Sequence, residues 1–358
     1  MKKDNTKTSL FNRKRLISYL IFTIIFILTS SLSLLFIYRF LNTNTAVFTI
    51  RVFPPETMIQ TMLLFIFYIL MDSLRLLYIL KSLNISIEYT YILKLGFIHL
   101  FISNITPFSS GGGLAQIYFL NRKNVPLGNA IVVSTIKAIL PITFFFVTAP
   151  IILLLNRDLI NILPTNNIYI YSLVFGFIYI VIIYGVYKLF HNPRIIKIII
   201  SKTLLFIQNR KLISKKTSYN YQRKSFREIN NFFSGIKLFL KGKKINIILS
   251  LLSTALFLIS LFLFPVILIK GLRYNISSLS IIIKQIVITF IAYFAPTPGA
   301  SGVSEGGFTL LFSNLIKKEH LISLTFTWRF FTIYLGMFIG MIVFYYEAFK
   351  KRNGGNQN

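Results

Sequence analysis

The chain alternates long apolar runs with short polar or basic segments along nearly all of its 358 residues. A helix needs about 20 apolar residues to cross the hydrocarbon core of a bilayer, and six of the runs are long enough. We expect these spanning helices at about residues 16–38, 58–80, 126–155, 168–190, 245–269 and 322–346. The pattern therefore predicts an all-α polytopic membrane protein with about six spanning helices.

Two further apolar stretches are interrupted by proline and glycine, so neither predicts a simple spanning helix. Each has two apolar limbs around its break, at about 91–105 and 114–120 in the first stretch and at about 276–295 and 306–316 in the second. At least one limb of each pair is too short to span a bilayer. We interpret both stretches as re-entrant helical hairpins, the first entering from the cytoplasmic face and the second from the external face.

The two breaks carry the same short motif. The second break repeats four residues of the first at an offset of 191 positions. In the first break they are Thr106, Pro107, Ser110 and Gly111, and in the second Thr297, Pro298, Ser301 and Gly302. With 11 prolines and 18 glycines in the chain, this repetition is not expected by chance. We therefore predict an inverted repeat of two spans flanking each hairpin, an arrangement common in transporters, with the site at the breaks.

The basic residues predict the topology. The net charge is +30, and most lysines and arginines lie between the apolar runs. Because basic loops stay in the cytoplasm, we expect both termini there, in a cell membrane. We expect one membrane domain at 1–350, with halves at 16–190 and 245–347, joined by a basic connector at 191–244 and followed by a short tail at 351–358.

The connector region is unusually rich in positive charge. Residues 188–244 hold fifteen lysines and arginines against one acid, Glu228. Part of this segment either lies on the anionic leaflet as an amphipathic helix or forms a solvated basic loop. Since lipid explains the charge, we expect a membrane surface as its partner and no nucleic acid.

The rest of the sequence lacks the residues and motifs of several kinds of catalytic or metal-binding site. Cysteine is absent, which excludes disulfides and thiolate sites. His99, His191 and His320 are too far apart in sequence to form a local metal-binding motif. No Walker phosphate loop, nucleophile elbow or pair of catalytic carboxylates occurs. We therefore expect no metal, no cofactor and no catalytic residue, which argues against independent enzyme activity.

The breaks themselves are the candidate substrate site. Unpaired backbone groups cannot face lipid, so both breaks should line an enclosed or water-filled cavity. A helix opening after each break would aim backbone N–H groups at an anion such as phosphate. Alternatively, proline and glycine merely turn a tight hairpin. The uncharged candidate residues are Thr106, Pro107, Ser110, Gly111, Gly112, Gln116, Tyr118, Thr297, Pro298, Gly299 and Gly302.

Charged residues within the apolar runs extend this set. An ionised side chain at the centre of a membrane helix costs about 2.5–3.5 kcal/mol, so it usually faces a partner or a cavity. Glu305 either pairs with Arg329 or Lys137, exchanges a proton during transport, or complements the dipole of its helix. Secondary candidates are Asp72, Arg75 and Lys284; Asp72 and Arg75, three residues apart, either serve the site or simply pair with each other. The basic residues Arg75, Lys137, Lys284 and Arg329 exceed the acids Asp72 and Glu305 by two charges. This excess favours binding of an anion such as a lipid phosphate.

At the two breaks the sequence resembles the lysylphosphatidylglycerol synthase transmembrane-region family, also called flippase-like integral membrane proteins. Residues 106–120 resemble the first family motif, and residues 296–305 resemble the second. Arg329 stands where the family tends to have an arginine in its last helix. The chain departs from many members at Gly113 and Gln116, where they have an acid and an arginine, and at Lys137, where an arginine is expected.

The resemblance implies a membrane domain that moves aminoacylated phosphatidylglycerol or other lipids between leaflets. Full-length synthases of the family add a soluble domain that transfers lysine from tRNA to the lipid, and no such domain is expected after the last span here. The chain would then be a transporter of an anionic phospholipid or lipid-linked glycan, or the membrane part of a phosphatidylglycerol lysyltransferase. A third possibility is a structural anchor for an envelope-synthesis complex. A separate soluble enzyme or a second copy of the chain are possible partners.

Overall fold

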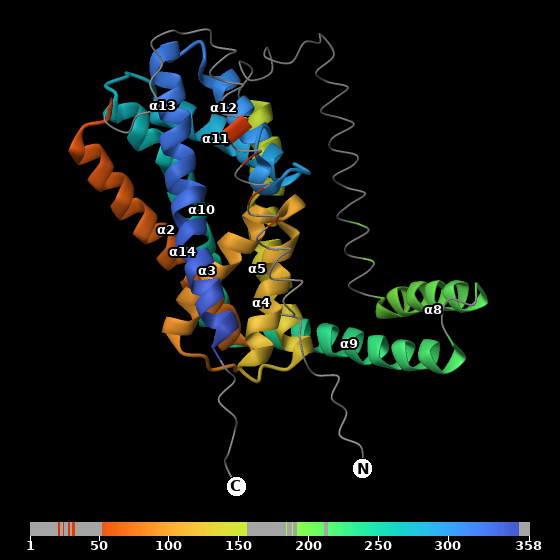
Figure 1. The fold of residues 1–358 in the computed structure, drawn as a ribbon. Coiled ribbons are helices and arrows are strands. Elements are labelled where there is room, and N and C mark those ends of the chain that lie inside the picture. The colour runs from red at the N-terminus through yellow and green to blue at the C-terminus, as the bar shows by residue number, and fades with distance from the viewer. Residues whose placement is uncertain are drawn as a thin grey trace. The chain divides into compact units, whose positions relative to one another are not determined.

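The computed structural model describes residues 52–155, 192–210 and 214–350, with a few single residues between 21 and 32 and at 184 and 188. Every regular element in these ranges is helical (Figure 1). The predicted spans at 16–38 and 168–190 fall almost entirely outside the described residues. The basic segment at 1–15 and the tail at 351–358 lie outside them as well.

Four described segments are long and apolar enough to cross a membrane. They are α2 (Pro55–Ser82), residues Leu127–Phe145 of α5 (Leu127–Leu155), α10 (Lys244–Gly271) and the segment Lys318–Phe349. The last consists of α13 (Lys318–Arg329), the π-helical turn η4 (Phe330–Tyr334) and α14 (Leu335–Phe349). Each coincides with a predicted span. The all-helical class is confirmed for the described residues, and the total of six spans stays a prediction.

The two interrupted stretches form helix–break–helix elements where the sequence places them. The first consists of α3 (Tyr89–Ile105), the 3₁₀ turn η2 (Pro107–Ser109) and α4 (Ser110–Arg122); the second consists of α11 (Ser278–Tyr293), η3 (Pro298–Ala300) and α12 (Val303–Phe312). The ten residues of α12 rise only about 15 Å, half of a hydrocarbon core. Re-entry of both elements into one membrane face stays a prediction.

Contacts group the chain into two compact units. The first contains residues 1–74, 88–116 and 253–358, and the second contains residues 75–87 and 117–252. Both breaks belong to the first unit. The predicted halves at 16–190 and 245–347 stay a prediction.

Close packing of α14 on α3 organises the first unit. Two glycines four residues apart, Gly336 and Gly340, face α3 and let the helix backbones approach, as in small-residue packing of membrane helices. Gly340 lies against the carbonyl group of Phe97. Nearby, the rings of Phe101 and Phe344 meet with centroids 5.6 Å apart. The first break directly follows α3 and is therefore attached to this close-packed pair of helices.

The connector belongs to the second unit. It folds as α8 (Pro193–Asn209) and α9 (Lys215–Lys241), which lie side by side (Figure 1). The start of α9 is capped by Ser214, whose hydroxyl oxygen accepts the N–H of Thr217 at 3.2 Å. Helix α9 also packs on α5. The sequence left open an amphipathic helix or a solvated loop for this segment. Its described residues are mainly helical.

Candidate functional site

A buried ion pair closes the second break. The Nε of Arg329 donates to Oε1 of Glu305 at 2.8 Å, and its Nη2 donates to the carbonyl oxygen of Gly299 at 2.6 Å. The other carboxylate oxygen, Oε2, accepts the N–H of Gly302 at 2.7 Å. The side chains of Arg329 and Glu305 are 4% and 0% exposed. One arginine therefore ties the end of α13 to both η3 and α12.

The local sequence explains this geometry. Pro298 opens η3, where its fixed φ suits the first position of a helical turn. Gly302 has φ +86°, a conformation that residues with a side chain rarely adopt, and it precedes α12. Glu305 is the third residue of α12, the position from which a glutamate caps the residue before the helix. Arg329 ends α13 immediately before the π-helical turn η4, a type of irregularity often found at functional sites.

The two breaks share one backbone shape. Phe108 has φ 54° and ψ 22°, while Gly299, its counterpart at the offset of 191, has φ 57° and ψ 18°. The next residues, Ser109 and Ala300, are also left-handed, with φ of 51° and 54°. The repeated sequence motif thus corresponds to a repeated turn.

Hydrogen bonds within the breaks repeat as well. The hydroxyl of Ser110 donates to the carbonyl oxygen of Pro107 at 2.9 Å, and Ser301 donates to Pro298 at the same distance. Because both serines make the same local hydrogen bond, each stabilises its own turn.

The first break is held without charge. The position equivalent to Glu305 is Leu114, which is 68% exposed. Here the hydroxyl oxygen of Thr106 accepts the N–H of Gly111 at 2.9 Å, where the second break uses a carboxylate. The sequence predicted that free N–H groups at each break would bind an anion. One of them at each break, that of Gly111 or Gly302, instead donates to a side chain of the protein.

The two turns η2 and η3 lie against each other in the first unit. Residues 107–110 are exposed and Phe108 is 60% exposed, whereas Gly299, Ser301 and Glu305 are buried. The structure brings together most of the predicted site residues at this junction: Thr106, Pro107, Ser110, Gly111, Gly112, Thr297, Pro298, Gly299, Gly302, Glu305 and Arg329.

Gly112 sets the spacing between α3 and α4 in the first element. A Cβ atom at this position would overlap the Oγ atom of Ser103 and approach the ring of His99, both on α3. We expect Gly112→Ala to lower the free energy of unfolding by about 1–3 kcal/mol through overpacking. Thermal unfolding in detergent would measure the loss.

Gly306→Ala is the matched control for this change, because a methyl group at this position would meet no atom within 4 Å. Gly306 is also helical and exposed. A Gly112→Ala protein that unfolds at the same temperature as Gly306→Ala would contradict the close approach of α3 and α4.

Gln116 is a buried polar residue near the first break. It is 1% exposed, and neither its amide nitrogen nor its amide oxygen has a hydrogen-bond partner within the described residues. Buried amides are rarely left in this state, so water or a ligand is the expected partner. Its predicted part in substrate binding stays a prediction with this observation in its favour.

The other predicted residues are distant in sequence from both breaks or belong to the other unit. Tyr118, Lys137 and Arg75 belong to the second unit, and Lys137 is 2% exposed within α5. Asp72 and Lys284 belong to the first unit, where Asp72 is buried and Lys284 is half-buried. Their roles at the breaks, and the pairing of Asp72 with Arg75, stay predictions.

Sequence reasoning missed a second ion pair in the first unit. Lys94 Nζ on α3 lies 2.8 Å from Oε1 of Glu347 on α14. The partners are 253 positions apart, and no spacing rule links them. Phe108 was missed too, although the offset of 191 aligns it with a glycine and so predicts a left-handed residue. The close packing at Gly336 and Gly340 could have been predicted from the sequence, since two glycines four residues apart in an apolar helix indicate a close helix contact.

Two comparisons with known proteins bear on this arrangement. The family model described as "Lysylphosphatidylglycerol synthase TM region" matches residues 15–340. A UPF0104 membrane protein of Archaeoglobus fulgidus is 25% identical over 271 residues, which cover 76% of this chain and 80% of that protein. The family match covers both breaks, the first three described spans and the fourth as far as residue 340.

Proposed function

Because this chain belongs to the lysylphosphatidylglycerol synthase transmembrane-region family, we propose that it moves an anionic phospholipid or a lipid-linked glycan between the leaflets of a membrane. The phospholipid would be phosphatidylglycerol or an aminoacylated form of it, which keeps the anionic phosphate diester although the aminoacyl group adds positive charge. Family membership and the four apolar spans make it a membrane protein with a lipid-related role. Translocation is the step we add.

The buried pair of Glu305 and Arg329 carries the proposal. Two ionised groups inside a membrane domain are costly, and here they stand at a non-helical point of the chain. The Nε and Nη2 atoms of Arg329 make its two hydrogen bonds, and Nη1 makes none to the described part of the chain. The remaining donor Nη1 suits one oxygen of a phosphate diester, and Nε would serve a second oxygen once Glu305 is displaced.

The arrangement of the breaks supports a path through the protein. In the proposal, both helix–break–helix elements are re-entrant hairpins of an inverted repeat, and their turns meet near the middle of the membrane. The common backbone shape of η2 and η3 and their mutual contact favour this view. Exposed backbone and hydroxyl groups at residues 107–110 would then face the passing headgroup, since they cannot face lipid chains.

Glu305 acts in this proposal as the group that competes with the substrate. A buried arginine without an anion is strongly unfavourable, but exchange of one anion for another keeps its charge balanced. The phosphate of the substrate would take the place of Glu305 beside Arg329 and give it back on leaving. The carboxylate thus makes binding reversible.

The name of the family favours one alternative, the membrane part of a phosphatidylglycerol lysyltransferase. In that case the purified protein, alone or with a soluble partner, would support transfer of lysine from charged tRNA to phosphatidylglycerol. Radiolabelled lysine in the lipid fraction would favour this alternative, and its absence would favour translocation alone.

Translocation is tested in proteoliposomes that carry fluorescent phosphatidylglycerol, with dithionite bleaching the outer leaflet. We expect Glu305→Gln and Arg329→Ala to lower the rate by about 10- to 100-fold, because each removes a charged hydrogen bond worth about 1.5–3 kcal/mol. The first change would slow release of the phosphate, which the carboxylate displaces, and the second would weaken its binding. Glu319→Gln and Lys318→Ala are the matched controls, since both residues are exposed at the start of α13. Full translocation by a folded Glu305→Gln protein would remove this residue from the site.

A further inference from the structure

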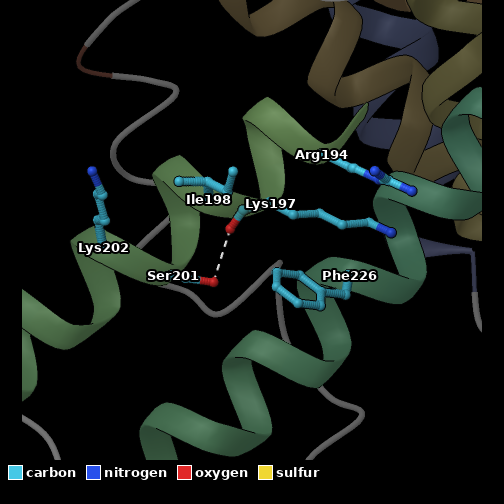
Figure 2. A pocket seen from close by; sticks show the side chains of 6 residues that line it. All are labelled: Arg194, Lys197, Ile198, Ser201, Lys202 and Phe226. Atoms are coloured by element: carbon cyan, nitrogen blue, oxygen red, sulfur yellow. Dashed lines mark hydrogen bonds between the residues drawn. The ribbon is translucent and has the colours of Figure 1, made fainter. Parts of the chain in front are cut away.

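An open pocket of about 360 Å³ lies between helices α8 and α9 in the second unit. Figure 2 shows its lining, which is Arg194, Lys197, Ile198, Ser201, Lys202 and Phe226. None of these residues belongs to the breaks, so the translocation proposal leaves the pocket unexplained.

Hydrogen bonds fix the shape of the pocket. Gln222 on α9 donates from Nε2 to the hydroxyl oxygen of Ser201 on α8 at 2.8 Å. Ser201 in turn donates to the carbonyl oxygen of Lys197 at 2.9 Å. The Nζ atom of Lys197 lies 5.6 Å from the centroid of the Phe226 ring, in cation–π contact. The two helices are thereby held at one register, with an aromatic wall beneath a cation.

Two of the cations point the same way. In Figure 2 the side chains of Arg194 and Lys197 run alongside each other toward α9, while Lys202 is directed away from them. They are three residues apart in the first turns of α8, on one helix face. A guanidinium and an ammonium group at this spacing suit the oxygens of a single phosphate group.

Among the residues that the structure describes, the pocket contains no counter-charge. Its described lining has no acid, and neither has α8. The acid of α9, Glu228, lies 3.8 Å from Arg227 through its Oε1 atom. An anion from outside is therefore the expected partner of Arg194 and Lys197.

An exposed apolar stripe on α8 indicates where that anion comes from. Ile198, Ile199, Leu205 and Phe206 are each more than half exposed, and their spacing of seven places them on one face. Lys202 stands in the middle of this stripe, as a lysine does when it extends toward lipid headgroups. In a membrane protein such a helix is typical of the interface between headgroups and acyl chains. Ile198 belongs to both the stripe and the pocket, so the pocket would open at headgroup depth.

We propose that this pocket binds the phosphate of an anionic phospholipid headgroup, with Arg194 and Lys197 holding the phosphate oxygens and Phe226 forming the wall. The apolar stripe of α8 enters the same leaflet. This site is separate from the breaks and does not depend on their part in translocation.

The test uses the full chain in vesicles and a label beside the pocket. The chain has no cysteine, so Thr203→Cys, at an exposed position of α8, gives a single point for a fluorescent dye. Phosphatidylglycerol bearing a nitroxide near its headgroup quenches the dye only when it is close. We expect quenching by phosphatidylglycerol to saturate at a lower lipid fraction than quenching by equally labelled phosphatidylcholine.

Arg194→Gln with Lys197→Gln should shift half-maximal quenching to an at least about tenfold higher phosphatidylglycerol fraction, since each basic residue contributes to binding at the surface. The matched control is Arg223→Gln with Lys224→Gln on α9, which removes the same charge from exposed positions outside the pocket. We expect this control to stay within about threefold of the parent.

Three outcomes would overturn the proposal. Equal loss in the two double variants would mean that general positive charge attracts the lipid. Equal quenching by both lipids would mean that the pocket does not distinguish anionic headgroups. Displacement by millimolar inorganic phosphate, beyond that caused by chloride of equal ionic strength, would assign the pocket to free phosphate.

Discussion

Replacing Arg329 by methionine is expected to destabilise the protein by about 3–5 kcal/mol, because Glu305 would be left as a buried charge without its partner. The carbonyl oxygen of Gly299 would lose its hydrogen bond in the same step. Thermal unfolding in detergent measures the change. A variant as stable as the parent would mean that the pair is not buried in the folded protein.

The double variant Glu305→Met with Arg329→Met separates stability from function. Replacement of a complete buried ion pair by apolar side chains is often neutral or stabilising, so most of the unfolding temperature should return. Translocation should stay slowed by about 10- to 100-fold, since Arg329 no longer supplies a cation at the second break. If the double variant is as unstable as Arg329→Met alone, the loss comes from packing of the arginine and not from the unpaired carboxylate.

The pair Lys94 and Glu347 provides a comparison for these variants. Its lysine side chain is 37% exposed and its glutamate side chain 8% exposed, in contrast to 4% and 0% for Arg329 and Glu305, so water reaches this pair only from the lysine side. Water screens such a pair, so Lys94→Met should cost much less than Arg329→Met. A smaller loss of stability in Lys94→Met than in Arg329→Met would show that the cost depends on how deeply the ion pair is buried.

Gly340→Ala is the second change with a large expected effect. Its methyl group would overlap the carbonyl oxygen of Phe97 and lie 2.9 Å from the Cβ atom of Phe101, so α14 must move away from α3. Overpacking of this kind typically costs about 1–3 kcal/mol, and a backbone neighbour cannot easily yield. Thermal unfolding of the purified protein would detect the loss.

Gly336→Ala adds the same methyl group one helical turn earlier. There the nearest atom is the Cδ1 atom of Leu100 at 3.0 Å, the flexible end of a side chain. We therefore expect a smaller loss than at Gly340. Equal losses at both positions would contradict the backbone contact between α3 and α14.

The spans and the breaks could be predicted from the sequence because both depend on local properties. Apolar length determined the four spans in the described residues, and proline with glycine determined the places where helices end. The motif at the offset of 191 further predicted that the two turns would be alike. Their common left-handed residues at Phe108 and Gly299 follow from that repetition.

The partner of Glu305 was beyond the sequence alone. Both Arg329 and Lys137 were possible, because burial in a membrane demands a partner for a carboxylate without identifying it. The choice depends on how α13 approaches α12, since the two charged residues are 24 positions apart in sequence. The contact of Lys94 with Glu347 depends in the same way on the packing of α3 against α14, which no periodic pattern specifies.

The carboxylate of Glu305 divides its two oxygens between different tasks. Oε2 secures the first turn of its own helix through Gly302, while Oε1 alone reaches Arg329. Loss of the arginine contact would consequently leave the winding of α12 intact. The exchange of Glu305 for a substrate phosphate proposed above would therefore not require α12 to unwind, and the same carboxylate would be in place for the next exchange.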